Sequence, residues 1–180
     1  TSLELVSTTN ATDYLVIPSS DLPSFGTNDF TIEFWMYPNS TTTNWGLTSS
    51  ATILDTDASA GSGADWWAIH QNNATIQFAT NSANLIVTSS ALTALTWQHV
   101  AIVRSGSTIT AYIDGTSAGT ATQGTTLGGT RKLYIGQQNG FSRWFKGYLE
   151  NLQILKGVAK YTANFTPPIQ TQGRSYQATS

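Results

Sequence analysis

The chain is built from short β-prone runs separated by turn signals, and this alternation limits the folds it can adopt. Each run either alternates apolar with polar side chains or is rich in β-branched and aromatic residues. Turn dipeptides such as Asp114-Gly115, Gly128-Gly129 and Asn139-Gly140 lie between them. A dozen short strands at this spacing predict an all-β sandwich or barrel. The runs cover residues 3–6, 14–17, 30–37, 52–55, 66–70, 75–79, 85–88, 97–104, 108–114, 119–122, 132–136 and 145–155.

Helical patterns are nearly missing from the sequence. We expect at most one helical turn, over 158–164, ahead of Pro167-Pro168. With 180 residues, the chain is long enough for one domain and short for two. We therefore predict a single domain over 1–168, followed by a polar, loosely held tail over 169–180. The sequence starts at Thr1 without an initiator Met, so we expect it to be processed or to be part of a longer protein.

The low charge of the chain narrows the classes of partner. Only 10% of residues are charged, against about 25% in an average soluble domain, so Ser, Thr, Asn, Gln and Gly must form most of the surface. Arg131-Lys132 is the only adjacent basic pair, which disfavours nucleic-acid binding. No apolar run approaches the ~20 residues of a membrane span, so we predict no membrane insertion. Such weakly charged surfaces suit secreted and virion-exterior β proteins.

The run FTIEFWMYP at 30–38 predicts where the core lies and raises a question. Successive side chains of a strand point to opposite faces, so Phe34 and Met36 lie on a core face. The other face carries Glu33, Trp35 and Tyr37, although an exposed face should be polar. The residues that we expect between the sheets are Phe34, Met36, Val100, Ile102, Ile109, Ile113, Leu133 and Ile135.

Something must cover Trp35 or bind to it. The chain offers three covers of its own: the N-terminal strand, the 140–147 loop, or the 158–168 segment with Tyr161 and Phe165. Apolar segments near the end of a domain often pack onto a sheet that lacks a partner layer. We therefore expect the protein itself to bury most of Trp35, while Tyr37, nearer the end of the strand, reaches the surface.

The same face is also a candidate glycan site. An indole stacks on the C–H face of a sugar, and a carboxylate accepts hydrogen bonds from its hydroxyl groups. Glu33 and Tyr37 beside Trp35 supply this combination. The alternative is that Trp35 belongs to a second, smaller core.

Two further places offer candidate glycan residues. Trp66 and Trp67 are adjacent in a strand, so one should face the core and the other a cleft, with His70 on the face of Trp66. A His beside a Trp is more often a structural residue. The loop 140–147 offers Arg143 and Trp144, which either contact a ligand or fix the loop to the sandwich.

A metal site is a separate hypothesis. Asp55, Asp57 and Asp65 lie in a loop of small residues and could supply oxygen ligands for Ca²⁺. The loop does not follow the EF-hand pattern, and Asp is also an ordinary turn residue, so a simple turn remains the alternative. The pattern requires no cofactor, and Ca²⁺ is the one candidate.

Four segments of the chain form a recognisable set: NDFTIEFWMYP at 28–38, WQHVAIVRSGSTITAYIDG at 97–115, LYIG at 133–136 and FKGYLENLQILKGVAKYTANFTPP at 145–168. In order and spacing these segments resemble the laminin-G-like, concanavalin-A-like jelly-roll family. The likeness spans nearly the whole chain and implies a two-sheet antiparallel jelly-roll sandwich. The last segment looks most like versions in phage tail, fibre and head-exterior proteins of aquatic viruses. Where that family pattern has an acidic pair, this chain has Glu150-Asn151, so one carboxylate is missing.

Catalytic patterns are weak, and we predict no enzyme. Glycoside hydrolysis needs two facing carboxylates, and the three glutamates form no cluster in the sequence. A polysaccharide lyase is a less favoured alternative. We expect a non-catalytic jelly-roll module, displayed outside a cell or on a virion, that recognises a glycan or a host-surface polysaccharide. The alternative is a structural decoration or fibre protein that packs on other virion subunits.

Overall fold

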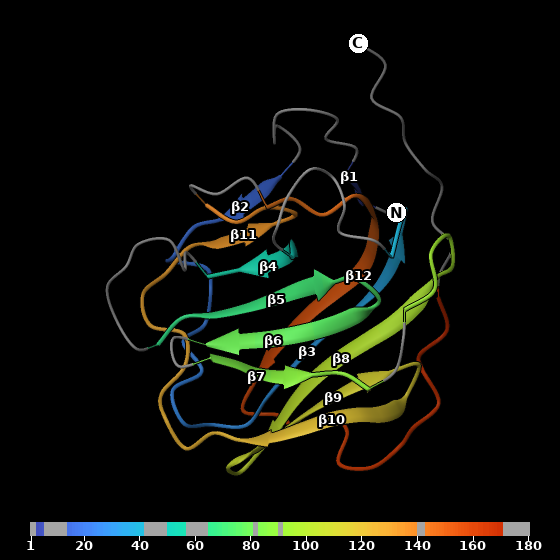
Figure 1. Cartoon of the computed structure of the whole chain (residues 1–180). Helices are drawn as coiled ribbons and strands as arrows, with labels where there is room; N and C mark the ends of the chain where they lie inside the picture. The colour runs from blue at the N-terminus through green and yellow to red at the C-terminus, as the bar shows by residue number, and fades with distance from the viewer. Residues whose placement is uncertain are drawn as a thin grey trace.

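The computed structural model describes residues 3–5, 14–41, 50–56, 65–80, 83–89, 92–139 and 143–170. These residues form two antiparallel sheets of six strands that pack face to face (Figure 1). Each of the twelve predicted runs overlaps one observed strand, which confirms the predicted all-β jelly-roll sandwich.

In both sheets, strands that are far apart in the sequence lie next to each other. Sheet A consists of β1 (Leu3–Leu5), β12 (Gly147–Lys156), β3 (Phe30–Pro38), β8 (Gln98–Ser105), β9 (Thr108–Ile113) and β10 (Thr116–Thr122), in that order. Sheet B consists of β2 (Leu15–Ile17), β11 (Leu133–Ile135), β4 (Ala51–Asp55), β5 (Trp67–Asn72), β6 (Thr75–Thr80) and β7 (Ala83–Val87).

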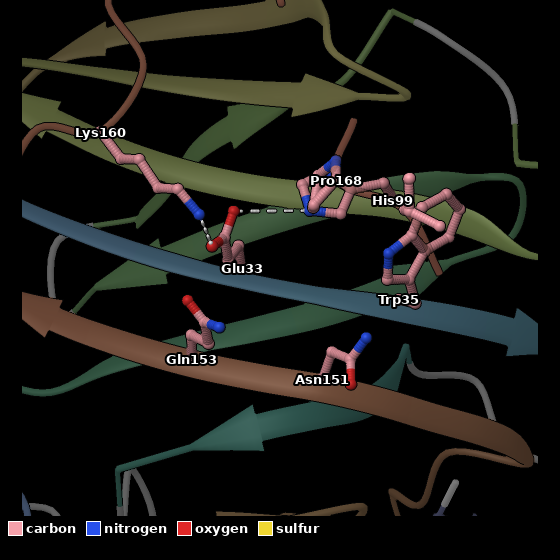
Figure 2. A pocket seen from close by; sticks show the side chains of 8 residues that line it. Glu33, Trp35, His99, Asn151, Gln153, Lys160 and Pro168 are labelled. Carbon is pink, nitrogen blue, oxygen red and sulfur yellow. Dashed lines mark hydrogen bonds and ion pairs between the residues drawn. The ribbon is translucent and has the colours of Figure 1, made fainter. Parts of the chain in front are cut away.

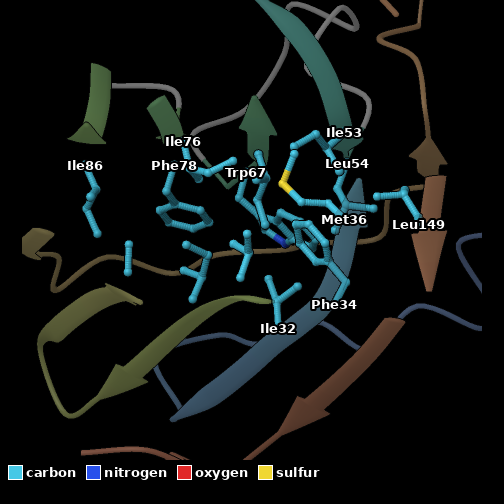
Figure 3. Close-up of a cluster of buried hydrophobic side chains, with 14 of the residues drawn as sticks. Ile32, Phe34, Met36, Ile53, Leu54, Trp67, Ile76, Phe78, Ile86 and Leu149 are labelled. Atoms are coloured by element: carbon cyan, nitrogen blue, oxygen red, sulfur yellow. The ribbon is translucent and has the colours of Figure 1, made fainter. Parts of the chain in front are cut away.

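The core fills the space between the sheets, as the alternation in β3 predicts. Ile32, Phe34 and Met36 point from β3 toward Trp67 and Phe78 of sheet B (Figure 3). All eight residues predicted for the core are at most 5% exposed, which confirms the register. Trp67 is fully buried in this core, so one residue of the Trp66-Trp67 pair does face inward, as predicted.

The C-terminal segment (residues 157–170) is extended and bent rather than helical, so the predicted helical turn over 158–164 is wrong. The segment runs along the outer side of sheet A beside β8 and β9 (Figure 1). Its Ala159, Tyr161 and Phe165 pack on the outer side chains of these two strands. The predicted tail begins within this segment, and residues 171–180 lie outside the described part of the chain. The described residues include no helix that could cross a membrane.

Candidate functional site

The outer face of β3 is where the aromatic and acidic side chains of FTIEFWMYP lie, and the C-terminal segment covers part of it. The hydroxyl of Thr31 donates to the carbonyl of Val158 at 2.8 Å and accepts from the amide of Lys160 at 2.9 Å. Of the three covers expected for this face, the segment with Tyr161 and Phe165 is the one that the described residues place there. The start of the segment is therefore fixed to the first half of β3.

Stacked aromatic rings and a close backbone contact fix the middle of the segment. Tyr161 and Phe165 are parallel with their ring centroids 3.5 Å apart, and both rings contact Tyr112. The amide of Phe165 donates to the carbonyl of Gly115 at 2.9 Å. Gly115 has a φ of 75°, and a Cβ there would lie 1.9 Å from the Phe165 carbonyl oxygen. Only glycine meets both conditions, so the Asp114-Gly115 turn is also the docking point of the segment.

Glu33 is a buried carboxylate held by three partners, and it is 2% exposed. Lys160 Nζ donates to Glu33 Oε1 at 2.5 Å, and the Tyr161 hydroxyl donates to Oε2 at 2.8 Å. His99 Nε2 lies 3.5 Å from the same Oε2 (Figure 2). Burial alone would raise the pKa of Glu33, but hydrogen bonds from His99, Lys160 and Tyr161 outweigh it and lower the pKa to about 2. The carboxylate is therefore ionised at neutral pH.

The pKa values of Lys160 and Tyr161, the two partners of Glu33 from the C-terminal segment, are also shifted. Burial alone would lower the pKa of Lys160, but the bond and charge of Glu33 raise it. Burial and the Glu33 carboxylate both raise the pKa of Tyr161. Lys160 is thus charged and Tyr161 is neutral at neutral pH, and the ion pair leaves this corner of the site without net charge.

A cavity of about 290 Å³ lies beside Glu33, between sheet A and the C-terminal segment. Three strands and the segment each contribute to its wall, and the side chains converge as Figure 2 shows. Trp35 supplies an aromatic surface, and the other contributors are mainly polar. The lining residues are Glu33, Trp35, His99, Asn151, Gln153, Lys160, Pro168 and Ile169.

A β-bulge in β12 places two amide side chains at the cavity. Glu150 pairs with Trp35 and Gln153 pairs with Glu33, so three steps along β12 match two steps along β3. Asn151 within the bulge has a φ of 54°, a conformation that Asn tolerates better than most residues. Bulges of this kind redirect side chains and are frequent next to binding sites. Because of the bulge, Asn151 and Gln153 both line the cavity.

Two buried polar atoms on cavity residues have no hydrogen-bond partner within the described part of the protein. They are Nε1 of Trp35 and Nδ1 of His99, and His99 is 1% exposed. Buried polar groups without partners are rare, and each one calls for an explanation. Both nitrogens are buried, so a ligand in the cavity would reach neither of them unless the surrounding side chains moved.

Trp35 and Tyr37 are both largely buried but still reach the surface in part. The C-terminal segment packs on Ala101, Val103 and Tyr112 and leaves one side of the Trp35 indole to the cavity. Tyr37 lies outside the cavity lining and contacts Trp97, with ring centroids 5.6 Å apart.

The other predicted glycan residues do not join Glu33. His70 lies on β5 of sheet B, accepts or donates a hydrogen bond with Thr52 at 3.0 Å, and is 4% exposed. Burial, and the charge of Arg143 to a smaller extent, lower the pKa of His70 to about 4, so it is neutral at pH 7. Trp66 precedes β5 and is half-buried, and Trp144 forms a β-bridge with Gln137. Of the six candidates, Glu33 and Tyr37 lie on sheet A and His70 lies on sheet B. The other three, Trp66, Arg143 and Trp144, lie outside the strands.

The predicted Ca²⁺ ligands are only partly within the described residues. Arg131 binds the Asp65 carboxylate through Nη2 at 2.7 Å and Nε at 3.0 Å. Burial would raise the pKa of Asp65, but the Arg131 guanidinium outweighs it and lowers the pKa. Asp55 is buried, and Asp57 lies outside the described residues. Within the described part of the chain, no three acidic, His or Cys side chains form a metal-binding group, and the Ca²⁺ site stays a prediction.

Comparisons with known proteins agree with the architecture. Residues 9–160 match the model of a family described as the concanavalin A-like lectin/glucanases superfamily. No curated protein sequence matches the chain significantly. Among solved structures, the chain is similar to domains LG4-5 of the mouse laminin α1 chain, with 15% identity, a TM-score of 0.59, and coverage of 84% of this chain and 40% of that one.

Two bacterial structures are similar to the same degree. One is a putative carbohydrate binding protein from Bacteroides ovatus, with 16% identity, a TM-score of 0.60, and coverage of 82% of this chain and 42% of that one. The other is domain 4 of AbnA, an extracellular arabinanase from Geobacillus stearothermophilus solved with arabinotriose, with 17% identity, a TM-score of 0.56, and coverage of 79% and 66%. At such identities the likeness shows the fold. The chain spans less than half of the laminin and Bacteroides chains.

Proposed function

We propose that this chain, which belongs to the concanavalin A-like lectin/glucanases superfamily, is a non-catalytic module that binds a neutral glycan in the cavity on the outer face of sheet A. The observation that carries the proposal is the convergence of the Trp35 indole with polar side chains from three strands and the C-terminal segment. Sugar sites combine an aromatic surface with a few fixed polar groups in this way.

The chemistry of the lining favours an uncharged ligand. Glu33 and Lys160 neutralise each other, so the cavity has no free charge to offer an acidic sugar. Asn151 and Gln153 present amide groups, which both donate and accept hydrogen bonds. The volume of about 290 Å³ is at the lower end of small-molecule sites, which suits one sugar residue. The carbohydrate-binding protein and the arabinotriose complex among the similar structures support this class of ligand.

The protonation states of Glu33 and Tyr161 argue against catalysis. A glycosidase needs a protonated carboxylic acid and a second carboxylate, whereas Glu33 is ionised and is the only carboxylate in the described lining. A lyase would need a tyrosine that gives up its proton easily, and the pKa of Tyr161 is raised. Incubation with β-glucans, galactans and alginate should release neither reducing ends nor unsaturated products. Turnover that Glu33→Gln abolishes would contradict the non-catalytic proposal.

A glycan array followed by calorimetry tests the binding proposal. We expect binding to at least one neutral gluco-, galacto- or arabino-oligosaccharide, and a loss of about tenfold or more in affinity for Trp35→Ala. Gln153→Ala, at an exposed position, should also weaken binding and should leave the fold intact. Tyr14→Ala is the matched control, because Tyr14 is a partly exposed aromatic residue next to sheet B.

Two results would contradict the proposal. One is the absence of binding to any neutral glycan on the array. The other is a glycan whose affinity stays the same in Trp35→Ala and Gln153→Ala when thermal melting shows both variants to be folded.

We also propose that the module is displayed on the exterior of a phage particle, or outside a cell. The resemblance of residues 145–168 to segments of phage tail, fibre and head-exterior proteins supports this context, as does the low charge of the surface. Mass spectrometry of purified particles from the source would be expected to detect the chain. Its absence from the particles would leave only the extracellular setting.

A further inference from the structure

Three aromatic side chains form a row immediately beyond the cavity on the outer face of sheet A. Tyr37 follows Trp35 by two residues on β3, so both point to the same side. Tyr148 of β12 pairs with Tyr37, and Trp97 precedes β8 next to the Gln98–Met36 pair. The ring centroid of Tyr37 lies 5.6 Å from that of Trp97 and 5.7 Å from that of Tyr148. The Trp97 and Tyr148 centroids lie 6.4 Å apart, so the three rings converge into a compact cluster. We call these three residues the aromatic row, after their order across β12, β3 and the start of β8.

The row is left partly open to solvent. All three of its side chains are half-buried, whereas Tyr112, which the C-terminal segment covers, is 3% exposed. Single exposed aromatic residues are ordinary, but three in mutual contact make a patch that needs a reason. At one end of the row the Tyr148 hydroxyl donates to the Glu4 carboxylate at 2.8 Å, so a hydrogen-bond acceptor lies beside the rings.

The backbone next to the row is strained. Leu95, two residues before Trp97, has a φ of 58° and a side chain that is 63% exposed. Its amide donates to the carbonyl of Pro38, the residue after Tyr37, at 2.8 Å. A bulky residue with positive φ is an outlier, and such outliers gather at functional sites. This strain, together with the partly exposed rings, indicates a binding surface rather than a purely structural cluster.

We infer that the aromatic row is a second sugar subsite, so that the protein binds a neutral oligosaccharide extending along β3 from Trp35 to the row. The inference rests on the proposed function. Trp35 and Tyr37 are about 7 Å apart along the strand, a distance that a chain of linked sugars spans and a single sugar does not. Continuity with a polar cavity and the adjacent Glu4 carboxylate favour a carbohydrate over a protein partner, because charged residues are depleted at the core of protein interfaces.

Paired ligands of different length test this inference. The probes are methyl glucoside with cellotetraose, methyl galactoside with galactotetraose, and methyl arabinofuranoside with arabinotetraose, each measured by calorimetry on the full chain. For the pair that binds, we expect the tetrasaccharide to bind about tenfold or more tightly than the monosaccharide. Trp97→Ala should remove this gain and leave the monosaccharide affinity unchanged, and Tyr148→Ala should do the same.

The controls separate this inference from the proposed function. Tyr14→Ala should keep the gain, and thermal melting should show that Trp97→Ala and Tyr148→Ala are folded. Equal affinities for both lengths, or a gain that survives in both variants, would overturn the inference and leave cavity binding in place. No binding of any probe would overturn both. A concentration-dependent dimer that Trp97→Ala abolishes, without a gain for the tetrasaccharide, would show a protein contact and overturn the inference.

Discussion

At the scale of single residues, one buried carboxylate links sheet A to the C-terminal segment. Glu33 accepts hydrogen bonds from Lys160 and Tyr161 of the segment and lies beside His99 of β8. A buried charge is tolerated only when its partners satisfy it. Neither Lys160 nor Tyr161 lies near Glu33 in the sequence, so alternation within β3 places the Glu33 side chain but does not reveal what holds it.

The lowered pKa of Glu33 predicts a contribution to stability that depends on pH. The unfolded chain binds a proton at Glu33 near pH 4.5, and the folded chain does so only near pH 2. The contribution is therefore complete above pH 4.5 and is lost as the pH falls to 2. A shift of this size corresponds to on the order of 3 kcal/mol. We expect the free energy of unfolding of Glu33→Gln, measured with urea from pH 5 to pH 2, to decrease less than that of the original protein, because the variant has no carboxylate at this position to protonate.

His70 provides a contrast within the same measurement. Its pKa is lowered from 6.5 to about 4, so it affects stability in a higher pH range than Glu33 does. Between pH 6.5 and pH 4, His70 is protonated in the unfolded chain but stays neutral in the folded chain. Stability should decline from pH 6.5 to pH 4 in both the original protein and Glu33→Gln. Identical curves for the two proteins below pH 4.5 would contradict the assigned role of Glu33.

At the scale of elements, the cavity depends on how the C-terminal segment docks. Lys160, Pro168 and Ile169 form the wall opposite the sheet, and Gln170 donates to the Glu150 carboxylate at 2.9 Å. The Gly115 turn holds the middle of the segment between these two ends. A change at this turn should therefore affect the cavity without touching its lining.

Gly115→Ala tests this dependence. The new Cβ would lie 1.9 Å from the Phe165 carbonyl oxygen, so the segment must shift, in addition to the cost of a positive φ. Gly106→Ala is the matched control, because Gly106 has a φ of 61° and no atom within 4 Å of the added Cβ. The control should lose about 1–2 kcal/mol of unfolding free energy, and Gly115→Ala clearly more.

The rate of proteolysis and the glycan affinity of Gly115→Ala and Gly106→Ala provide a second comparison of these two variants. Gly115→Ala should be cut faster within 157–170 and should bind glycan more weakly than Gly106→Ala. Equal stability, cleavage and affinity in the two variants would show that the turn does not hold the segment.

The sequence predicts the strands well and the covering segment poorly. In runs such as 30–37, apolar side chains recur at every second residue, which matches the period of a strand. The residues that face the core can therefore be deduced from their order in the sequence. For residues 158–164 the sequence predicts a helical turn ahead of Pro167-Pro168, yet the segment is extended. Its hydrogen bonds go to Thr31, Gly115 and Ser117, which are distant in sequence and leave no local pattern.

The site shows the same limit. Glu33 is a candidate from sequence because it lies beside Trp35, but His99, Gln153 and Lys160 are not among the candidates. The bulge that brings Asn151 and Gln153 to the cavity depends on pairing between β12 and β3. The only local sign of it is an Asn, a residue that accepts positive φ. Sequence alone therefore indicates the correct face of the sheet but not the complete site.

At the scale of the whole molecule, the two outer faces of the sandwich differ. The outer face of sheet A carries the C-terminal segment, the cavity and the aromatic row. On sheet B, the polar side chains of His70 and Thr52 are buried and hydrogen-bonded to each other. We propose that residues 1–168 act as one module whose ligand contacts lie on sheet A. The chain has six tryptophans, and their positions allow this asymmetry to be measured directly.

The most direct test follows the six indole N–H signals by NMR while cellotetraose, galactotetraose or arabinotetraose is added to saturation. Single Trp→Phe variants assign the signals. We predict that with at least one of these ligands the Trp35 signal shifts, because its indole lines the cavity. The signal of Trp67, fully buried between the sheets, should stay in place. A Trp35 signal unmoved by all three ligands, or shifts confined to Trp66 and Trp144, would contradict binding on the outer face of sheet A.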